Sequence, residues 1–317
     1  IFEWVVLSFA LYIGYLFYEE YSQSKGDIKD FSGRTVLITG ASSGIGRQLA
    51  KDFNERGAQV IITARRKEEL EKVRKECKKP NMVHVRVMDL SDIDGLVQIS
   101  KEINSKFKVD LLINNGGTSM REEFKNLTLK MVTQMMNVNY LSGAALARHI
   151  GCEMVKRKSG HIVNVISMAG LFPVPVRTIY SASKYATRLF SNSIRAELKD
   201  DNVLITDVFP GYVQTNISKN ALVGDGSSFG KIDENINKGM KVEELSRRIL
   251  SNVTAQEERN QGQKGFVGSI LNNHNRLIVD KWHVKLAVFL ANLSDDLMKL
   301  FTGIKYKSQI KVMRKAK

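Results

Sequence analysis

The chain has 317 residues, of which 43% are hydrophobic and 26% charged, a globular composition with room for one large domain or two small ones. Its two cysteines and five histidines show no metal-ligand spacing and no disulfide framework. The formal net charge of +15 suits a phosphorylated ligand, an anionic lipid or nucleic acid. Because the basic residues are dispersed and no aromatic-rich recognition motif accompanies them, we predict that nucleic acid is not a partner.

Residues 1–18, IFEWVVLSFALYIGYLFY, form an apolar segment with one charge, Glu3. A helix of this length spans roughly 27 Å, close to the ~30 Å hydrocarbon core of a bilayer. A cleaved signal sequence and a helix packed on the protein body are the alternatives, although no small-residue cleavage site precedes Glu19. We predict a transmembrane anchor over residues 1–20, in the endoplasmic reticulum, peroxisomal or mitochondrial membrane. The mixed charges that follow do not set its orientation.

From residue 34 onward, short apolar runs alternate with segments of helical spacing. The expected strands are RTVLITG, AQVIITAR, HVRVMDL, VDLLINNG, GHIVNVIS and NVLITDVFPG. Strands rich in Val, Ile and Leu that alternate with helices are typical of a parallel sheet covered on both faces. We therefore predict an α/β fold with a doubly wound, Rossmann-like parallel sheet over residues 30–270.

The pattern changes after Gly268. Residues 276–301 are strongly apolar with charges at helical spacing, and the tail that follows has six basic residues and no acidic one. We predict an amphipathic C-terminal helix and basic tail over residues 271–317. An anionic membrane surface, a partner protein and a second copy of the chain are possible contacts, and an ordinary C-terminal helix with a solvated basic end is the alternative.

The glycine-rich segment TGASSGIG, residues 39–46, directly follows an expected strand and opens an expected helix. Gly40, Gly44 and Gly46 permit a tight turn and close approach of the backbone to a dinucleotide pyrophosphate. The N-terminus of the next helix supplies free N–H groups and a partial positive charge. In this strand–turn–helix context the segment predicts a dinucleotide cofactor.

The next expected strand ends in TARRK. A carboxylate at this position would bind the ribose 2′-hydroxyl of NAD, whereas this chain has Arg65 and Arg66, whose guanidinium groups suit a 2′-phosphate. We predict NADP(H) rather than NAD as the cofactor.

Polar residues and glycines also follow the third and fourth expected strands, at the edge of the sheet where ligands bind. Asp89, followed by Leu90, could accept a hydrogen bond from the adenine amino group. The fourth expected strand ends in Asn114, Asn115, Gly116 and Gly117, where the glycines would let the chain pass beneath the cofactor and Asn115 and Gly116 would contact it. Each of these segments taken alone is equally consistent with an ordinary turn.

The segment SMAGLFPVPVRTIYSASK, residues 167–184, places a serine, a tyrosine and a lysine at fixed spacing. Tyr180 and Lys184 are at positions i and i+4, so on a helix they share one face. We expect the lysine cation to lower the tyrosine pKa, which is near 10 in a free side chain. Ser167 would polarise a carbonyl oxygen, and Tyr180 would donate the proton as hydride arrives.

Together, TGxxxGxG, the NNGG strand end and the spaced Ser, Tyr and Lys resemble the short-chain dehydrogenase/reductase family over residues 33–215. The resemblance implies a fourth catalytic residue, Asn139, which would anchor a water that relays protons to Lys184, and it implies that Lys184 holds the ribose hydroxyls. It also implies a homo-oligomer. The cofactor contacts that it implies include Ser42, Ser43, Ile45, Pro210, Gly211, Val213 and Thr215.

Within the family, the chain is most similar to the membrane-anchored dehydrogenase/reductase member 7 and 7B subgroup, and it is also similar to 11-beta-hydroxysteroid dehydrogenase. The features that carry this likeness are the apolar N-terminus, the sequence TAR at the end of the second expected strand and the NNGG variant. That likeness implies acyl- or alkyl-dihydroxyacetone phosphate as the leading substrate, with steroid or retinoid carbonyls second. Ile166 replaces a serine common in relatives, and Ser43 replaces a basic residue found in some NADPH enzymes. Neither change removes a reacting group.

The combined interpretation is an NADPH-dependent reductase of a lipophilic carbonyl compound, with residues 216–240 as a mobile lid over the substrate. The alternative is an accessory subunit of a large membrane assembly that keeps its NADP(H) site without physiological turnover.

Overall fold

Seven parallel strands form one sheet in the computed structural model, which describes residues 14, 27–224, 226–231, 233–262 and 276–279. The spatial order is β3-β2-β1-β4-β5-β6-β7. The strands are β1 (Thr35–Thr39), β2 (Gln59–Ala64), β3 (Val83–Val87), β4 (Leu111–Asn114), β5 (Gly160–Val165), β6 (Val203–Pro210) and β7 (Arg276–Val279). The first six are the predicted strands, and the strand order reverses between β1 and β4, where open α/β sheets place their ligands.

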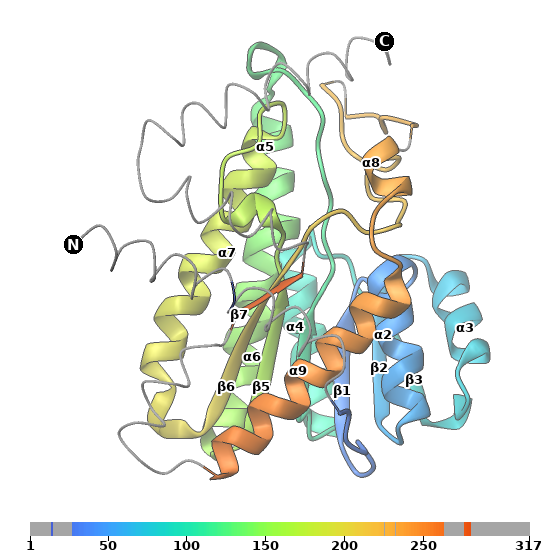
Figure 1. Cartoon of the computed structure of the whole chain (residues 1–317), viewed down its shortest axis with the longest axis vertical. Coiled ribbons are helices and arrows are strands. Elements are labelled where there is room, and N and C mark those ends of the chain that lie inside the picture. Colours follow the sequence, from blue (N-terminus) through green and yellow to red (C-terminus); the bar gives the residue numbers. More distant parts are fainter. Residues whose placement is uncertain (1–13, 15–26, 225, 232, 263–275, 280–317) are drawn as a thin grey trace.

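Alternate residues along each strand point to opposite faces of the sheet, so each face has its own apolar layer. Val36 and Ile38 of β1 pack on one face with α2 (Gly44–Glu55), α3 (Lys67–Glu76) and α9 (Val242–Gly262). Leu37 packs on the other face with α4 (Ile93–Lys106) and α6 (Ser142–Lys156). Figure 1 shows α9 running obliquely beside α2 across the first face, with α4 and α6 behind. The predicted doubly wound architecture is confirmed.

The second face is completed by further helical segments. They comprise α5 (Leu129–Met136), a π-helical turn η3 (Asn137–Leu141) that leads into α6, and α7 (Thr178–Glu197). Shorter elements are α8 (Glu234–Asn237) and the 3₁₀ turns η1 (Pro80–Met82), η2 (Phe124–Asn126), η4 (Met168–Gly170) and η5 (Lys199–Asp201).

The prediction of a helix beginning at Arg276 was wrong, because residues 276–279 form β7. This strand pairs in parallel with β6, from Asp207 opposite Arg276 to Pro210 opposite Val279. Three residues of the sequence RLIV are apolar and two of these are β-branched, and the outer edge of β6 offers backbone groups that need hydrogen-bond partners. The sheet therefore extends beyond residue 270, the predicted end of the reductase domain.

Two predicted segments lie almost wholly outside the described residues: the anchor over residues 1–20 and the rest of the C-terminal helix and tail, residues 280–317. Within the part of the chain that the structure describes, no helix combines the length and apolarity needed to cross a bilayer.

The two ends of the segment between β6 and α9 lie side by side. We call these paired ends, residues 212–214 and 239–240, the lid neck. The N–H of Met240 donates to the carbonyl of Tyr212 at 2.8 Å, and the N–H of Gln214 donates to the carbonyl of Met240 at 2.9 Å. A Cβ on Gly239 would lie 2.4 Å from the Tyr212 carbonyl oxygen, so this approach requires glycine. The predicted lid is thus a loop whose two ends are tied together.

Candidate active site

A cavity of about 780 Å³ opens at the carboxyl ends of the central strands, beside the reversal between β1 and β4. It brings together most of the predicted site residues from segments far apart in the sequence. Those lining it are Gly40, Ser42, Ser43, Gly44, Ile45, Arg65, Arg66, Asp89, Leu90, Asn115, Gly116, Ser167, Tyr180, Lys184, Pro210, Gly211, Val213 and Thr215. Two predicted residues, Gly46 and Asn139, lie behind the wall rather than in it.

The glycine-rich turn is shaped by close backbone contact. Gly40 has φ +67° and a Cβ there would lie 2.6 Å from the Cα of Gly116, so the close approach of the two loops at the switch point requires glycine at this position. A Cβ on Gly46 would lie 2.5 Å from Nδ2 of Asn115. That amide donates to the carbonyl of Thr39 at 2.9 Å and holds the turn closed. Gly46 therefore supports the turn from below.

The N-terminus of α2 fits a phosphate group. Within this described turn, Ser43 is the N-cap residue but its side chain makes no capping hydrogen bond, and the first helical turn carries no acidic residue. The N–H groups of that turn remain available, and the helix dipole favours an anion there. Together with the glycine cradle, these groups fit the pyrophosphate of a dinucleotide.

The other end of the cavity carries the residues predicted to hold the adenosine. Arg65 and Arg66 are exposed, and Nη2 of Arg66 lies 3.4 Å from Oγ of Ser42. Oδ1 of Asp89 accepts hydrogen bonds from the N–H and the hydroxyl of Ser91, at 2.9 and 2.8 Å, which fixes the carboxylate at the rim. Two guanidinium groups at this position are well suited to bind a 2′-phosphate.

The three reacting side chains converge in the middle of the cavity. Tyr180 and Lys184, one turn apart on α7, are both 5% exposed, and Nζ of Lys184 lies 5.9 Å from the Tyr180 ring centroid. Nζ donates to the carbonyl of Val165 at 3.1 Å. Ser167 follows β5, and its Oγ accepts a hydrogen bond from the N–H of Ala169 at 3.1 Å. Figure 1 shows α7 alongside β5 and β6, whose ends carry these loops.

Burial dominates the ionisation of both helical residues. It raises the pKa of Tyr180, against the opposing effects of a hydrogen bond with Ser167 and the charge of Arg177. It lowers the pKa of Lys184 to about 8. The expectation that the lysine would lower the tyrosine pKa is therefore not met in this structure, because burial outweighs the favourable charges around the phenol. The phenol is held protonated at neutral pH, as a proton donor must be.

Asn139 is buried in the π-helical turn and joins three segments. Its Oδ1 accepts from the N–H of Thr118 at 2.8 Å, and its Nδ2 donates to the Thr118 carbonyl and to Oγ of Ser183, both at 3.0 Å. A Cβ on Gly117 would lie 3.1 Å from Oδ1 of Asn139 and 3.4 Å from Nζ of Lys184, so both atoms flank this glycine. The structure places Asn139 close to Lys184, and the water relay stays a prediction.

Several cavity residues were missed from the sequence. Thr118 and Ser119 directly follow the NNGG strand end, whose predicted Gly117 also lines the cavity. Arg177 is three residues before Tyr180, and this spacing, which places both on one side of α7, is the sequence signal for it. The apolar lining has no local signal, because it is assembled from distant segments: Met168, Phe172, Val174, Ile217, Leu222 and Ile236.

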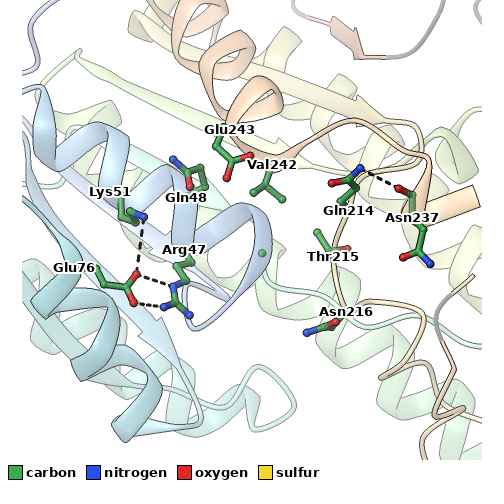
Figure 2. Close-up of a pocket in the computed structure, with 11 residues that line it drawn as sticks. Arg47, Gln48, Lys51, Glu76, Gln214, Thr215, Asn216, Asn237, Val242 and Glu243 are labelled. Carbon is green, nitrogen blue, oxygen red and sulfur yellow. Dashed lines mark hydrogen bonds and ion pairs between the residues drawn. The ribbon is translucent and has the colours of Figure 1, made fainter.

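A second, polar cavity of about 540 Å³ adjoins the first and shares Gly44, Thr215 and Asn216 with it. Figure 2 shows its two cations, Arg47 and Lys51, both directed at Glu76. Nε of Arg47 donates to Glu76 at 3.0 Å, and Nζ of Lys51 lies 4.0 Å from the same carboxylate. Glu243 also lines this cavity, so its two carboxylates balance its two cations, and the cavity is not a comparable candidate for an anionic ligand.

Comparison with known proteins agrees with this geometry. The family model described as short chain dehydrogenase matches residues 34–224. A Drosophila melanogaster protein named "Dehydrogenase/reductase SDR family protein 7-like" is 38% identical over 271 residues, covering 84% of this chain and 78% of its own. "Dehydrogenase/reductase SDR family member 7B" of Mus musculus is 36% identical over 224 residues, covering 69% of each chain.

Solved structures give the same result. A metagenomic short-chain oxidoreductase in complex with NADP has a TM-score of 0.54 and 29% identity, covering 57% of this chain and 84% of its own. A short-chain dehydrogenase from Sphingobium yanoikuyae in complex with NADPH has a TM-score of 0.61 and 25% identity, covering 77% of this chain and 86% of its own.

Proposed function

The chain belongs to the short-chain dehydrogenase family and is an NAD(P)-dependent oxidoreductase, and we propose that within this family it uses NADPH to reduce a carbonyl group on a lipophilic substrate. The observation that carries the proposal is the convergence of Ser167, Tyr180 and Lys184 in a cavity whose other end is a glycine-lined dinucleotide cradle. Burial keeps the Tyr180 phenol protonated, with a raised pKa, which is the form that gives a proton to a carbonyl oxygen.

The mechanism assigns one role to each side chain. NADPH, when bound, supplies a hydride to the carbonyl carbon. The Ser167 hydroxyl donates a hydrogen bond to the carbonyl oxygen, and the Tyr180 phenol transfers its proton to that oxygen, which completes the alcohol. Lys184, one turn along α7, provides a positive charge that stabilises the phenolate left behind, and it would also hold the ribose hydroxyls of the bound cofactor.

The lining beyond Tyr180 supports a lipophilic substrate. Phe172, Val174 and Leu222 are among the apolar residues on this side of the cavity. Following the likeness to the dehydrogenase/reductase member 7 and 7B proteins, the leading candidates are acyl- or alkyl-dihydroxyacetone phosphates, with steroid and retinoid carbonyls second. The test measures NADPH oxidation by the detergent-solubilised full chain against a panel of these ketones. Tight NADPH binding without turnover of any of them would overturn the proposal.

The cofactor preference depends on Arg65 and Arg66. Replacing both by Ala is expected to lower kcat/KM for NADPH about 100-fold and to leave the value for NADH within a few-fold, since each charge-assisted hydrogen bond contributes roughly 1.5 kcal/mol. Arg47→Ala is the matched control, because that guanidinium is paired with Glu76 in the neighbouring cavity. Equal losses with NADPH and NADH would rule out recognition of the 2′-phosphate by these residues.

We also propose that residues 1–20 anchor the protein in a membrane, on the strength of their apolar sequence. The full chain is expected in the membrane pellet after an alkaline carbonate wash, and a chain starting at residue 27 in the supernatant. Release of the full chain into the supernatant by the wash would contradict the proposed membrane anchor. The expected homo-oligomer and its place in any membrane assembly stay predictions.

A further inference from the structure

A buried cluster of three charged residues borders the cavity on its substrate side. Arg121 comes from the loop after β4, Arg177 is the N-cap residue of α7, and Asp233 is the N-cap residue of α8 within the lid. Nη2 of Arg121 donates to Oδ2 of Asp233, and Nη2 of Arg177 lies 3.6 Å from the same oxygen. The cluster thus links the lid to two loops that flank the catalytic tyrosine.

One carboxylate is shared between two guanidinium groups in this cluster, and the sharing is unequal. Arg121 is 1% exposed, makes the closer ion pair and also stacks over the Phe229 ring at 5.1 Å. Oδ1 of Asp233 is occupied by the N–H and the side-chain amide of Asn235. Arg177 has the longer contact, and among the described residues its buried Nε has no hydrogen-bond partner. Nε and Nη1 of Arg121 are likewise buried without a partner among the described residues, but Arg121 does not line the cavity. Since one carboxylate cannot neutralise two guanidinium groups, the surplus positive charge reaches the cavity through Arg177.

That surplus charge faces the reaction site. The described charged residues that line the cavity are Arg65, Arg66 and Asp89 at the cofactor end, the catalytic Lys184, and Arg177. Arg177 precedes Tyr180 by one helical turn, and its charge acts to lower the pKa of the phenol. The guanidinium therefore lies within electrostatic reach of the group that protonates the carbonyl.

We infer that Arg177 is a specificity-determining residue that binds an oxyanion, a phosphate or a carboxylate, carried by the substrate a few bonds from the reacting carbonyl. A guanidinium presents paired donors that match such a group, and a partly buried site strengthens the contact. Arg121 and Asp233 position it through the shared carboxylate. The inference rests on the proposed carbonyl reduction and assigns a residue that would select anionic ketones over uncharged steroid and retinoid carbonyls.

The test compares binding to the full chain loaded with NADP⁺, which requires no turnover. The probes are a long-chain ketone with a phosphate two bonds from the carbonyl, the same ketone with a hydroxyl in place of the phosphate, and a keto acid of equal length. The native protein is expected to bind at least one of the two anionic probes about 10- to 100-fold more tightly than the hydroxyl probe. Which of them binds more tightly distinguishes phosphate from carboxylate.

Arg177→Met is expected to abolish this preference, and Arg177→Lys to restore part of it. Arg148→Met, which removes an exposed arginine of α6, is the matched control and should keep the preference. Unchanged NADP⁺ affinity would show that the Arg177 variants are folded. Equal binding of all three probes by the native protein, or a preference that survives Arg177→Met, would overturn the anion site even if ketones are reduced. A preference without turnover would instead overturn the reductase and leave the site standing.

Discussion

Tyr180→Phe is expected to lower the NADPH-dependent turnover of the protein by roughly 10²–10⁴-fold, the range typical of a positioned general acid. The substitution removes one oxygen atom from a side chain that is 5% exposed, so the ring still fills its space between α7 and the loop after β5. No other described side chain that lines the middle of the cavity combines a raised pKa with a transferable proton.

The measurement is kcat with the best ketone of the substrate panel, together with NADPH affinity from fluorescence. The affinity should stay within a few-fold, because the phosphates and the ribose are held by other groups. Tyr185→Phe is the matched control, since this tyrosine lies on the same helix but is 42% exposed. Turnover at the native rate in the Tyr180 variant would disprove the proton-donor role.

Lys184→Met is expected to abolish turnover and, at the same time, to stabilise the protein in the absence of cofactor. The lysine is 5% exposed, and burial lowers its pKa from 10.5 to about 8. The folded state then binds fewer protons than the unfolded chain between these values, so stability rises with pH across that window. Below pH 8 the buried lysine is charged in the folded state, and burying that charge lowers the free energy of unfolding by about 3 kcal/mol. Methionine, which is similar in length and uncharged, avoids this loss.

Thermal unfolding of the cofactor-free protein at pH 7 and pH 9.5 tests this expectation. The variant should unfold several degrees higher than the native protein at pH 7, and the difference should shrink at pH 9.5. Lys130→Met, at an exposed position of α5, controls for the loss of a charge. A variant that is less stable at pH 7 would show that the buried ammonium is compensated in the folded state.

The elements that the sequence predicted correctly are those encoded by local pattern. Six strands are indicated by apolar runs. The turn at Gly40 lies between a strand and a helix that the sequence pattern also predicts. Tyr180 and Lys184 are separated by one helical turn, so their common face follows from spacing alone. Strand β7 was mistaken for a helix because its pairing with β6 joins segments about 70 residues apart in the sequence.

The parts of the site that escaped prediction depend on tertiary contacts. The link between Asn139 and Thr118 arises across a π-helical turn, which has no distinctive sequence here. The pairing of Arg121 with Asp233 spans 112 positions in the chain. The direction of the pKa shift of Tyr180 depends on how completely the folded protein excludes water from the phenol. The spacing of charged residues in the sequence does not reveal that burial.

The lid neck has an evolutionary consequence. Since Tyr212, Gln214 and Met240 close the loop on itself, insertions and replacements between them need not disturb the register of β6 or the start of α9. Such a loop can be exchanged as a unit. Related proteins could therefore differ in substrate specificity and still share the same residues for hydride transfer. Chimaeras that swap residues 216–238 between paralogues, and so keep Thr215, would test this modularity.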